Sequence, residues 1–411
     1  MASLGRNRRW LIVCGISILL LVVYFKTEAE IKEDMRSDDE KNDRKKYVIK
    51  IEGKKLMNIT REKATSSSSI NKENKMYTAK QYEVCIPKQQ ILFLKTHKTG
   101  SSTLTSILQV YGFLRNLTFA VPKTGAQIIS RGFFRTDQVR PGKYDMLVNH
   151  ARYSRTEMQK VMKPNTTYIT IFRDPSTQIE SNFEYFLLRN TFHLENMPNP
   201  FQTFAENPSY YYSKYGQRSP FRHYMKNPNL YDLGLKESQQ EDRGVVEKFI
   251  AKIAKEFDLV LIQEYFNESL LLLKKLMCWE IDDILYLSKG KRSKKIRFDI
   301  DQSLRESIRK WSWGDVLLYD HFNKTLWSKI RDYGPSFQTD LAELEFNLNR
   351  ILNNCTVPNV VLDNRRETYF KLNKKGAPKC THMLRNDLTF TKLIRIAQYG
   401  EEEETGKVGL Q

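Results

Sequence analysis

The sequence predicts an α/β fold in which helices cover a mainly parallel sheet. Two observations lead to this: short apolar runs with the composition of buried strands, and helical spacing between them. The apolar runs are 91–94, 145–149, 168–172 and 259–262. Apolar residues in 104–111 and again in 250–257 follow the spacing i, i+3, i+4, i+7, which gathers them on one face of a helix. Strands that alternate with helices are typical of a parallel sheet.

Residues 1–84 differ in composition from the rest of the chain. Residues 1–9 are short and basic, and residues 10–25 carry no charge. A cleaved signal peptide would need a small-residue cleavage site, which Tyr24-Phe25-Lys26-Thr27 does not offer. An uncleaved transmembrane signal anchor at 10–25 fits better, with 1–9 as a cytosolic tail. Residues 26–84 are rich in Lys, Glu, Asp, Asn and Ser and predict a disordered lumenal stem.

The remainder has the features of a lumenal domain. Six glycosylation sequons are present, at Asn58, Asn116, Asn165, Asn267, Asn323 and Asn354. Four lumenal cysteines allow two disulfides in three possible connectivities, and they are Cys85, Cys278, Cys355 and Cys380. No cysteine or histidine spacing is typical of zinc ligands, so we expect no metal site.

We expect the folded domain to span 85–400, followed by a solvated tail at 401–411 that begins with four glutamates. The stretch 283–354 is predicted to be mostly helical. Its expected core residues are Trp311, Trp313, Phe322 and Trp327. The formal net charge of the chain is +19, of which +13 falls on residues 86–411. A basic domain favours an anionic partner such as a nucleotide, an acidic glycan or a nucleic acid, and the lumenal topology argues against nucleic acid.

The segment that follows the first strand predicts an anion site. After the strand at 91–94 comes Lys95-Thr96-His97-Lys98-Thr99-Gly100-Ser101-Ser102-Thr103, and then a helix. A tight strand-to-helix loop points backbone N–H groups at one spot, and the helix N-terminus adds partial positive charge. Gly100 allows close approach of the anion, Lys98 supplies a full charge, and the hydroxyls that follow can donate. The alternative is a polar loop capped by serine.

The position of the lysine separates this loop from nucleotide-triphosphate loops. A P-loop would have the pattern GxxxxGK[ST], with the lysine after the second glycine. Here Lys98 precedes the only glycine, Gly100. A kinase or NTPase is therefore disfavoured.

A second anion-binding element follows the strand at 168–172. Arg173-Asp174-Pro175 comes directly after it, and Ser181 lies eight residues beyond Arg173. Proline is favoured at the start of a helix, so Ser181 should lie about two turns along one. Arginine can hold a phosphate bidentately. The alternative is a salt bridge at the helix start.

The run 93–103 resembles the 5′-phosphosulfate loop of the galactose 3-O-sulfotransferases of the Golgi, the family that includes galactosylceramide sulfotransferase. The Thr96-His97 pair before Lys98 belongs to this resemblance. Arg173 and Ser181 are similar to the 3′-phosphate site of sulfotransferases. Further similar stretches are 259–266, 278–280 and 319–323, so the resemblance covers most of 90–330 and only loosely the last eighty residues.

The resemblance implies a P-loop-like sulfotransferase fold, with a central mainly parallel sheet flanked by helices and a helical C-terminal part. It implies 3′-phosphoadenosine 5′-phosphosulfate (PAPS) as sulfate donor without a metal, and a single-pass type II protein of the Golgi membrane. It also implies an acceptor that is a galactose-terminated glycan or glycolipid, sulfated on the galactose 3-hydroxyl. The expected donor-binding residues are Lys95, Thr96, His97, Lys98, Thr99, Gly100, Ser101, Ser102, Thr103, Arg173 and Ser181.

Sulfuryl transfer needs a base for the acceptor hydroxyl and positive charge for the leaving oxygen. Lys98 is the candidate for the charge. His150 is the candidate base, because it follows a predicted strand at the edge where ligands bind in α/β sheets and because histidine titrates near neutrality. The family has an Asn-His pair at this place. His97, inside the donor loop, is the rival base.

The acceptor site is less defined. Glu264, just after the strand at 259–262, could orient His150 or bind sugar. Tyr212 lies in an aromatic stretch that could stack on sugar or adenine, or pack in the core, and Arg218 nearby could hold acidic groups. The alternative functions are a sulfotransferase for another sugar or position and a non-catalytic lumenal glycan-binding protein. The last predicts loss of Lys98, Arg173 or His150, and all three are present.

Overall fold

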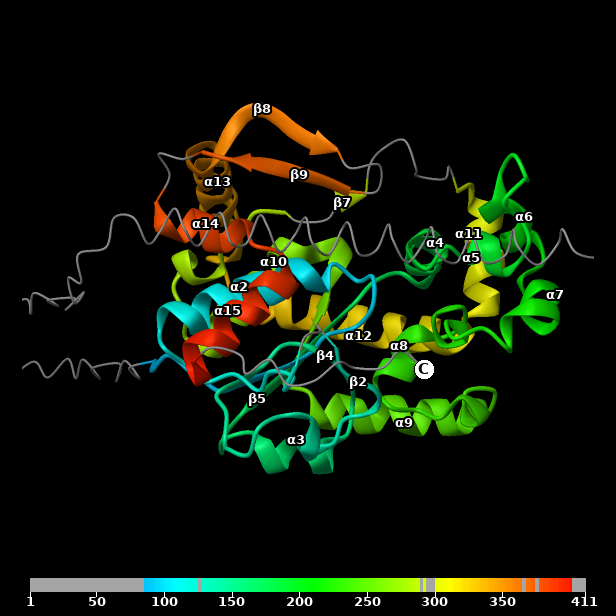
Figure 1. Ribbon diagram of the computed structural model, residues 1–411, viewed down its shortest axis with the longest axis horizontal. Coiled ribbons are helices and arrows are strands. Elements are labelled where there is room, and N and C mark those ends of the chain that lie inside the picture. Colours follow the sequence, from blue (N-terminus) through cyan, green and yellow to red (C-terminus); the bar gives the residue numbers. More distant parts are fainter. Residues whose placement is uncertain are drawn as a thin grey trace, which may run out of the picture. The chain divides into compact units, whose positions relative to one another are not determined.

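The structure is a computed structural model that describes residues 85–124, 128–288, 291–292, 300–363, 367–373 and 377–400 (Figure 1). The predicted tail 1–9, anchor 10–25, stem 26–84, C-terminal tail 401–411 and sequon Asn58 lie outside these residues. Within the described part, no helix combines the length and the apolar character that crossing a membrane requires.

Four parallel strands form the central sheet in the order β3-β1-β5-β6. They are β1 (Ile91–Leu94), β3 (Met146–Leu147), β5 (Thr167–Phe172) and β6 (Leu259–Ile262). Every residue of β1, β5 and β6 is buried, as expected for a parallel sheet covered on both faces. The α/β prediction is therefore confirmed. Strand β3 is shorter than the predicted run 145–149. The chain leaves the central sheet after Leu147 and, from His150 on, pairs in a second ladder.

That second ladder is a two-stranded sheet of β2 (Ile128–Phe133) and β4 (His150–Arg152). The helices that connect and cover the strands are α2 (Ser101–Leu114), α3 (Arg155–Val161), α4 (Pro175–Tyr185), α9 (Arg243–Glu256) and α10 (Phe266–Met277). Of these, α2 and α9 are the two helices predicted from apolar spacing. Pro175 is the first residue of α4, and Asp174 caps that helix by accepting from the Ser176 N–H at 2.9 Å, in agreement with the predicted helix start.

Between α4 and α9 the chain folds into short elements that periodicity did not predict. Three of them begin at proline, which suits the first helical position. The elements are α5 (Leu188–Thr191), α6 (Pro200–Glu206), α7 (Pro208–Tyr211), the π-helix η2 (Tyr212–Gly216), the 3-10 helix η3 (Arg222–Tyr224), α8 (Pro228–Asp232) and the 3-10 helix η4 (Glu237–Gln239). Buried apolar residues of this segment and of α4 make up most of a hydrophobic cluster that is separate from the main core.

The C-terminal part is mainly helical, as predicted. Its elements are α11 (Gln302–Trp311), α12 (Trp313–Arg331), α13 (Phe337–Cys355), β8 (Thr356–Asp363), β9 (Glu367–Leu372), α14 (Pro378–Leu384) and α15 (Asp387–Tyr399), with β7 (Lys291–Arg292) added to β9. Phe322 is buried, but the core prediction is wrong for Trp327, which is 37% exposed and lies edge-on to Tyr265. Helix α15 lies alongside α2 (Figure 1).

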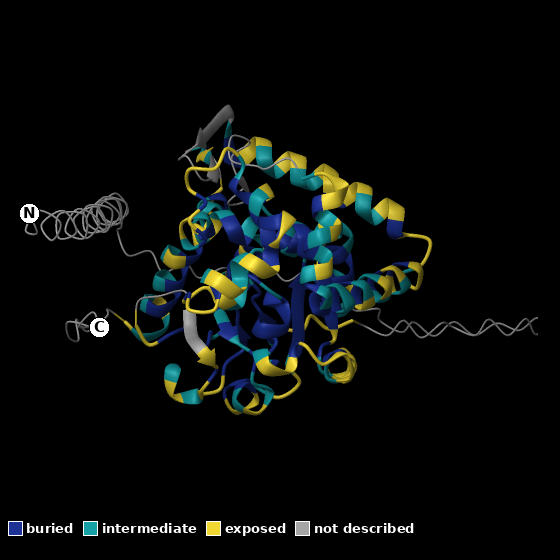
Figure 2. Ribbon diagram, turned by 90° about the vertical axis from the view of Figure 1, so that its right-hand side faces the viewer, coloured by how far each residue is buried: buried dark blue, intermediate teal, exposed yellow. Residues whose placement is uncertain are grey.

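Of the three possible disulfide connectivities, the structure has Cys85–Cys278 and Cys355–Cys380. The first joins the start of the described chain to the end of α10, and the second joins α13 to α14. Buried positions lie on the central strands and on the inner faces of the helices (Figure 2). The main core cluster contains residues from Ile91 through Ile394.

Candidate active site

The loop between β1 and α2, residues 95–100, is held in shape by its own hydroxyl groups. Thr96 Oγ1 donates to the Ile171 carbonyl at 2.5 Å, and Ser101 Oγ donates to the Thr96 carbonyl at 2.6 Å. Thr96 and Thr99 hydroxyls lie 2.8 Å apart. Each of these side chains is buried. Their hydrogen bonds therefore fix the curl of the loop.

The outer side of the loop is open. Lys98 and Gly100 have left-handed φ values of 58° and 77°, which turn the chain sharply into α2. Among the described residues, no side chain caps the N-terminus of α2, and Gly100 and Ser102 are exposed there. Thr103 is half-buried in the first turn. An anion can therefore approach the first backbone N–H groups of α2.

Arg173 joins this loop from the end of β5. Its Nε donates to Thr177 Oγ1 at 2.9 Å, and one terminal nitrogen donates to the Lys98 carbonyl at 3.3 Å. The Lys98 ammonium lies 3.9 Å from the centroid of the Tyr185 ring. Two cationic side chains from different elements thus flank the open side of the loop, and their binding of an anion there stays a prediction.

Ser181 lies on the face of α4 that meets the loop. Gln178, Ser181 and Tyr185 follow helical spacing and share one face. Gln178 donates to the His97 carbonyl at 2.8 Å, and the Lys98 ammonium lies over the Tyr185 ring. Ser181 lies between them on this face and is half-buried.

His150 begins β4, beside the loop. Its Nδ1 lies 3.0 Å from the Lys95 carbonyl oxygen, so Nδ1 carries the proton and donates, which leaves the Nε2 lone pair as an acceptor. Burial, followed by the nearby His97 and Lys95, holds the pKa of His150 well below 6.5. His150 is therefore a neutral imidazole near neutral pH, as a general base must be.

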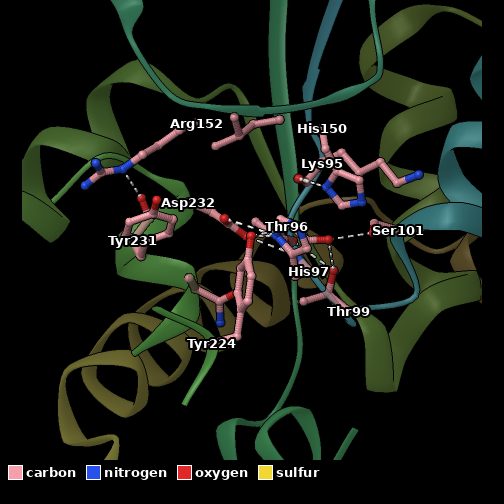
Figure 3. A network of polar contacts seen from close by, with 12 residues as sticks. Lys95, Thr96, His97, Thr99, Ser101, His150, Arg152, Tyr224, Tyr231 and Asp232 are labelled. Atoms are coloured by element: carbon pink, nitrogen blue, oxygen red, sulfur yellow. Dashed lines mark hydrogen bonds and ion pairs between the residues drawn. The ribbon is translucent and has the colours of Figure 1, made fainter. Parts of the chain in front are cut away.

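The His97 ring lies between three partners (Figure 3). Its Nδ1 is 2.9 Å from Asp232 Oδ2, which also accepts the His97 backbone N–H at 3.0 Å. Its Nε2 is 3.3 Å from the Tyr224 hydroxyl. Its face stacks on His150, with centroids 4.2 Å apart and planes at 16°. Sequence reasoning missed Asp232 and gave Tyr224 no role beyond the aromatic stretch, because no local pattern marks a contact across 135 or 127 positions.

Lys95 supports the loop from inside. Its ammonium forms a buried ion pair with Asp387 of α15. Glu264 accepts from the Asp174 N–H at 3.0 Å and from the Tyr319 hydroxyl at 3.2 Å, at the turn that carries Arg173. Glu264 is an exposed residue, but its neighbours partly desolvate the carboxyl, and this desolvation raises the pKa of that carboxyl.

The structure does not bring Tyr212 into this cluster. Tyr212 packs edge-on against Trp311 at 5.3 Å and lines a cavity of about 260 Å³ together with Arg222 and Lys226. Arg218 is exposed. Substrate binding by these two residues stays a prediction.

The sequons in the described part lie in different surroundings. Asn116, Asn165 and Asn354 are exposed. Asn267 is half-buried and accepts from the Tyr286 hydroxyl at 2.9 Å. Asn323 is half-buried on α12, with its side-chain oxygen enclosed. Exposure therefore favours modification at the first three.

The sequence pattern of the family described as galactose-3-O-sulfotransferase matches residues 11–369, which is most of the 411-residue chain. The chain belongs to this family. The resemblance inferred from the loop sequence is therefore confirmed, and the family accounts for the α/β architecture around the β1–α2 loop.

Several relatives of this galactose-3-O-sulfotransferase family member are similar over the same part of the chain. Galactosylceramide sulfotransferase of Bos taurus is 36% identical over 256 residues, 61% of this chain and 60% of the relative. Galactose-3-O-sulfotransferase 3 of Mus musculus is 34% identical over 278 residues, covering 64% and 63%. Galactose-3-O-sulfotransferase 2 of Homo sapiens is 33% identical over 256 residues, covering 61% and 63%. The aligned region thus spans less than two thirds of each of these relatives.

Membership in the galactose-3-O-sulfotransferase family implies, in general terms, PAPS as the sulfate donor. The arrangement fits a ligand with two separate anionic groups: an uncapped helix N-terminus beside Lys98, and Arg173 with Ser181 on the neighbouring strand and helix. Helices α14 and α15 lie beyond the matched residues, yet α15 supplies the acid that pairs with Lys95.

Proposed function

We propose that this protein transfers the sulfuryl group of PAPS to the 3-hydroxyl of a terminal β-galactose on a glycoprotein or glycolipid. The observation that carries the proposal is the convergence of the β1–α2 loop, Arg173 and a neutral His150 at one edge of the sheet. The names of the relatives support galactose as the acceptor sugar. A sulfotransferase acting on another sugar or position is the second candidate, since the donor site would serve it equally.

The donor-binding residues take two roles in this proposal. The backbone N–H groups at the start of α2, with Lys98, hold the 5′-phosphosulfate. Arg173 and Ser181 hold the 3′-phosphate, where the guanidinium can donate two parallel hydrogen bonds. Lys95, Thr96 and Ser101 keep the loop in the shape that this requires, through the contacts described above.

His150 and Lys98 carry the chemistry. PAPS supplies an activated S–O bond: the acceptor oxygen bonds to sulfur while the bond to the 5′-phosphate oxygen breaks, and the electron pair leaves on adenosine 3′,5′-bisphosphate. His150 Nε2 takes the proton of the acceptor hydroxyl. Lys98 stabilises the charge that develops on the leaving oxygen. Asp232 and Tyr224 hold His97 beside His150.

The proposal includes a location. Residues 10–25 would anchor a single-pass type II protein in the Golgi membrane, with 26–84 as the stem and 85–400 as the lumenal catalytic domain. The two disulfides support an oxidising compartment. Asn116, Asn165 and Asn354 are the sequons whose exposure favours glycosylation.

Transfer of radiolabelled sulfate from PAPS by the full-length chain tests the function. The acceptors are a β-galactose-terminated disaccharide, the same disaccharide with its galactose 3-hydroxyl methylated, and galactosylceramide. We expect label on the free disaccharide or on the lipid, and none on the methylated sugar. Label on the methylated sugar would contradict the position, and no label on any acceptor would contradict galactose as the substrate.

A further inference from the structure

The two histidines beside the loop are stacked face to face. Their ring centroids are 4.2 Å apart and their planes differ by 16°. In this geometry neither ring can donate a hydrogen bond to the other, since N–H groups lie in the ring plane. Two positive charges at this separation repel strongly in a partly buried site. A positive charge on His97 therefore disfavours a second charge on His150 and lowers the pKa of His150.

The surroundings of the two rings differ in charge. His97 Nδ1 lies 2.9 Å and 3.1 Å from the two oxygens of Asp232, a buried carboxylate. His150 Nδ1 meets only a neutral oxygen, the Lys95 carbonyl at 3.0 Å. A carboxylate in contact favours the charged form of an imidazole, whereas burial and neighbouring cations disfavour it.

The other charged and titratable groups around the pair act in the same direction. Lys95 and Lys98 disfavour a charge on His150, and the Lys95 ammonium stays in the site because Asp387 pairs with it. The groups that face the pair are Asp232 from α8, Tyr224 from η3, and Lys95 and Lys98 from the β1–α2 loop.

We propose that Asp232 is a positioning residue: its carboxylate holds the His97 ring against His150, so that a positive charge on His97 keeps His150 free to accept the proton of the acceptor hydroxyl. It does so without touching the substrate, through the ring that it holds. The inference rests on the proposed function only for the identity of the proton that His150 accepts. The effect of Asp232 on the titration of His150 is a property of the protein alone.

Replacing Asp232 by asparagine tests this through the pH profile of kcat/KM of the full-length chain. Asparagine keeps an acceptor for the His97 backbone N–H but removes the charge. Without the carboxylate, His97 no longer opposes the charged form of His150. We expect the acidic limb of the profile to move to higher pH by about one unit or more. Asp137→Asn removes an exposed acid that pairs with Arg135 and should leave the limb where it is.

Each other result speaks against the proposal. A limb that moves to lower pH would identify His97 as the base, activated by Asp232 as in a catalytic dyad. A uniform loss of activity at every pH, with the limb unmoved, would leave Asp232 a purely structural role. If the Asp232→Asn chain does not fold, His97→Gln serves as the second variant, because removing the ring that lowers the pKa of His150 should also move the limb upward.

A second readout does not depend on turnover. The chain has six histidines, whose ring signals can be followed by NMR as the pH is lowered and assigned with His97→Gln and His150→Asn. We expect the His150 ring to titrate at higher pH in Asp232→Asn than in the wild type. An unchanged His150 titration would overturn the proposal. If the His150 titration moves upward while no acceptor is sulfated, the inference stands and the proposed function fails.

Discussion

At the residue scale, hydrogen bonds divide the predicted donor-binding residues into two groups. Thr96 and Ser101 donate their hydroxyl protons to carbonyl oxygens of the loop and of β5. A hydroxyl has one proton, so these two cannot donate to an anion without giving up the loop contacts. Lys98, Ser102 and Arg173 lie on the open side, and they are the candidate side chains for binding it.

Arg173→Lys tests the 3′-phosphate site. Lysine keeps the charge but loses the planar pair of donors and the contact with the Lys98 carbonyl. We expect the affinity for adenosine 3′,5′-bisphosphate, measured by titration calorimetry on the full-length chain, to fall about tenfold or more, since hydrogen bonds to charged groups contribute about 1.5–3 kcal/mol each. Arg218→Lys, on an exposed arginine, should bind as the wild type does. Equal affinities in the two variants would exclude Arg173 from the site.

The sequence predicted His150 as the base because it follows a predicted strand, at the edge where parallel sheets bind ligands, and His97 as the rival because it lies inside the donor loop. It could not predict Asp232, which reaches His97 from a helix five residues long that begins at Pro228. Such a helix is too short for apolar periodicity, and the contact depends on how α8 packs. Tyr224 was visible only as one of several aromatic residues, because its neighbours in the chain face other ways.

At the element scale, α15 is part of the candidate site although it lies beyond the residues matched by the family. Asp387 at its first turn pairs with Lys95. Thr391 Oγ1, one turn on, accepts from Asn149 Nδ2 at 3.1 Å, next to His150. The helix therefore fixes both the start of the loop and the start of β4.

Asp387→Ala should destabilise the fold. It would leave the Lys95 ammonium, 2% exposed, without its partner, and removal of one partner of a buried ion pair costs about 3–5 kcal/mol. The exposed pair of Lys379 and Asp282 supplies the control, since Asp282→Ala should cost at most about 1 kcal/mol. The measurement is the free energy of unfolding in urea. Equal losses would mean that the buried pair contributes no more than a surface one.

Removing both charges distinguishes the ion pair from the packing. The double variant Lys95→Met, Asp387→Leu fills similar space with apolar atoms, and such replacements are often neutral or stabilising. We expect it to recover most of the stability that Asp387→Ala loses. Failure to recover would place the loss in the packing of α15 rather than in the uncompensated charge.

The predicted elements were those with strong local patterns. Continuous apolar runs predicted β1, β5 and β6, and helical spacing of apolar residues predicted α2 and α9. The strands β4 and β8 carry polar residues and pair outside the central sheet, so no apolar run marked them. The helical prediction for 283–354 was correct, but the exposed Trp327 shows that a large apolar side chain on a helix is weak evidence for burial.

At the scale of the whole molecule, distant parts of the sequence meet at one site. Lys95 and Asp387 are 292 positions apart, His97 and Asp232 are 135 apart, and the disulfide Cys85–Cys278 closes 193 positions. One main core cluster contains residues from β1 to α15. The candidate site is therefore a product of the complete domain, and we expect it to be lost as a unit when the domain unfolds.

The rate of sulfate transfer from PAPS to a β-galactoside by His150→Asn, beside its affinity for adenosine 3′,5′-bisphosphate, tests the account most directly. His321→Asn, on an exposed face of α12, is the matched control. We predict that His150→Asn binds the nucleotide as the wild type does and transfers sulfate about 10²–10⁴ times more slowly, while His321→Asn retains both properties. Transfer by His150→Asn at the wild-type rate would contradict the account.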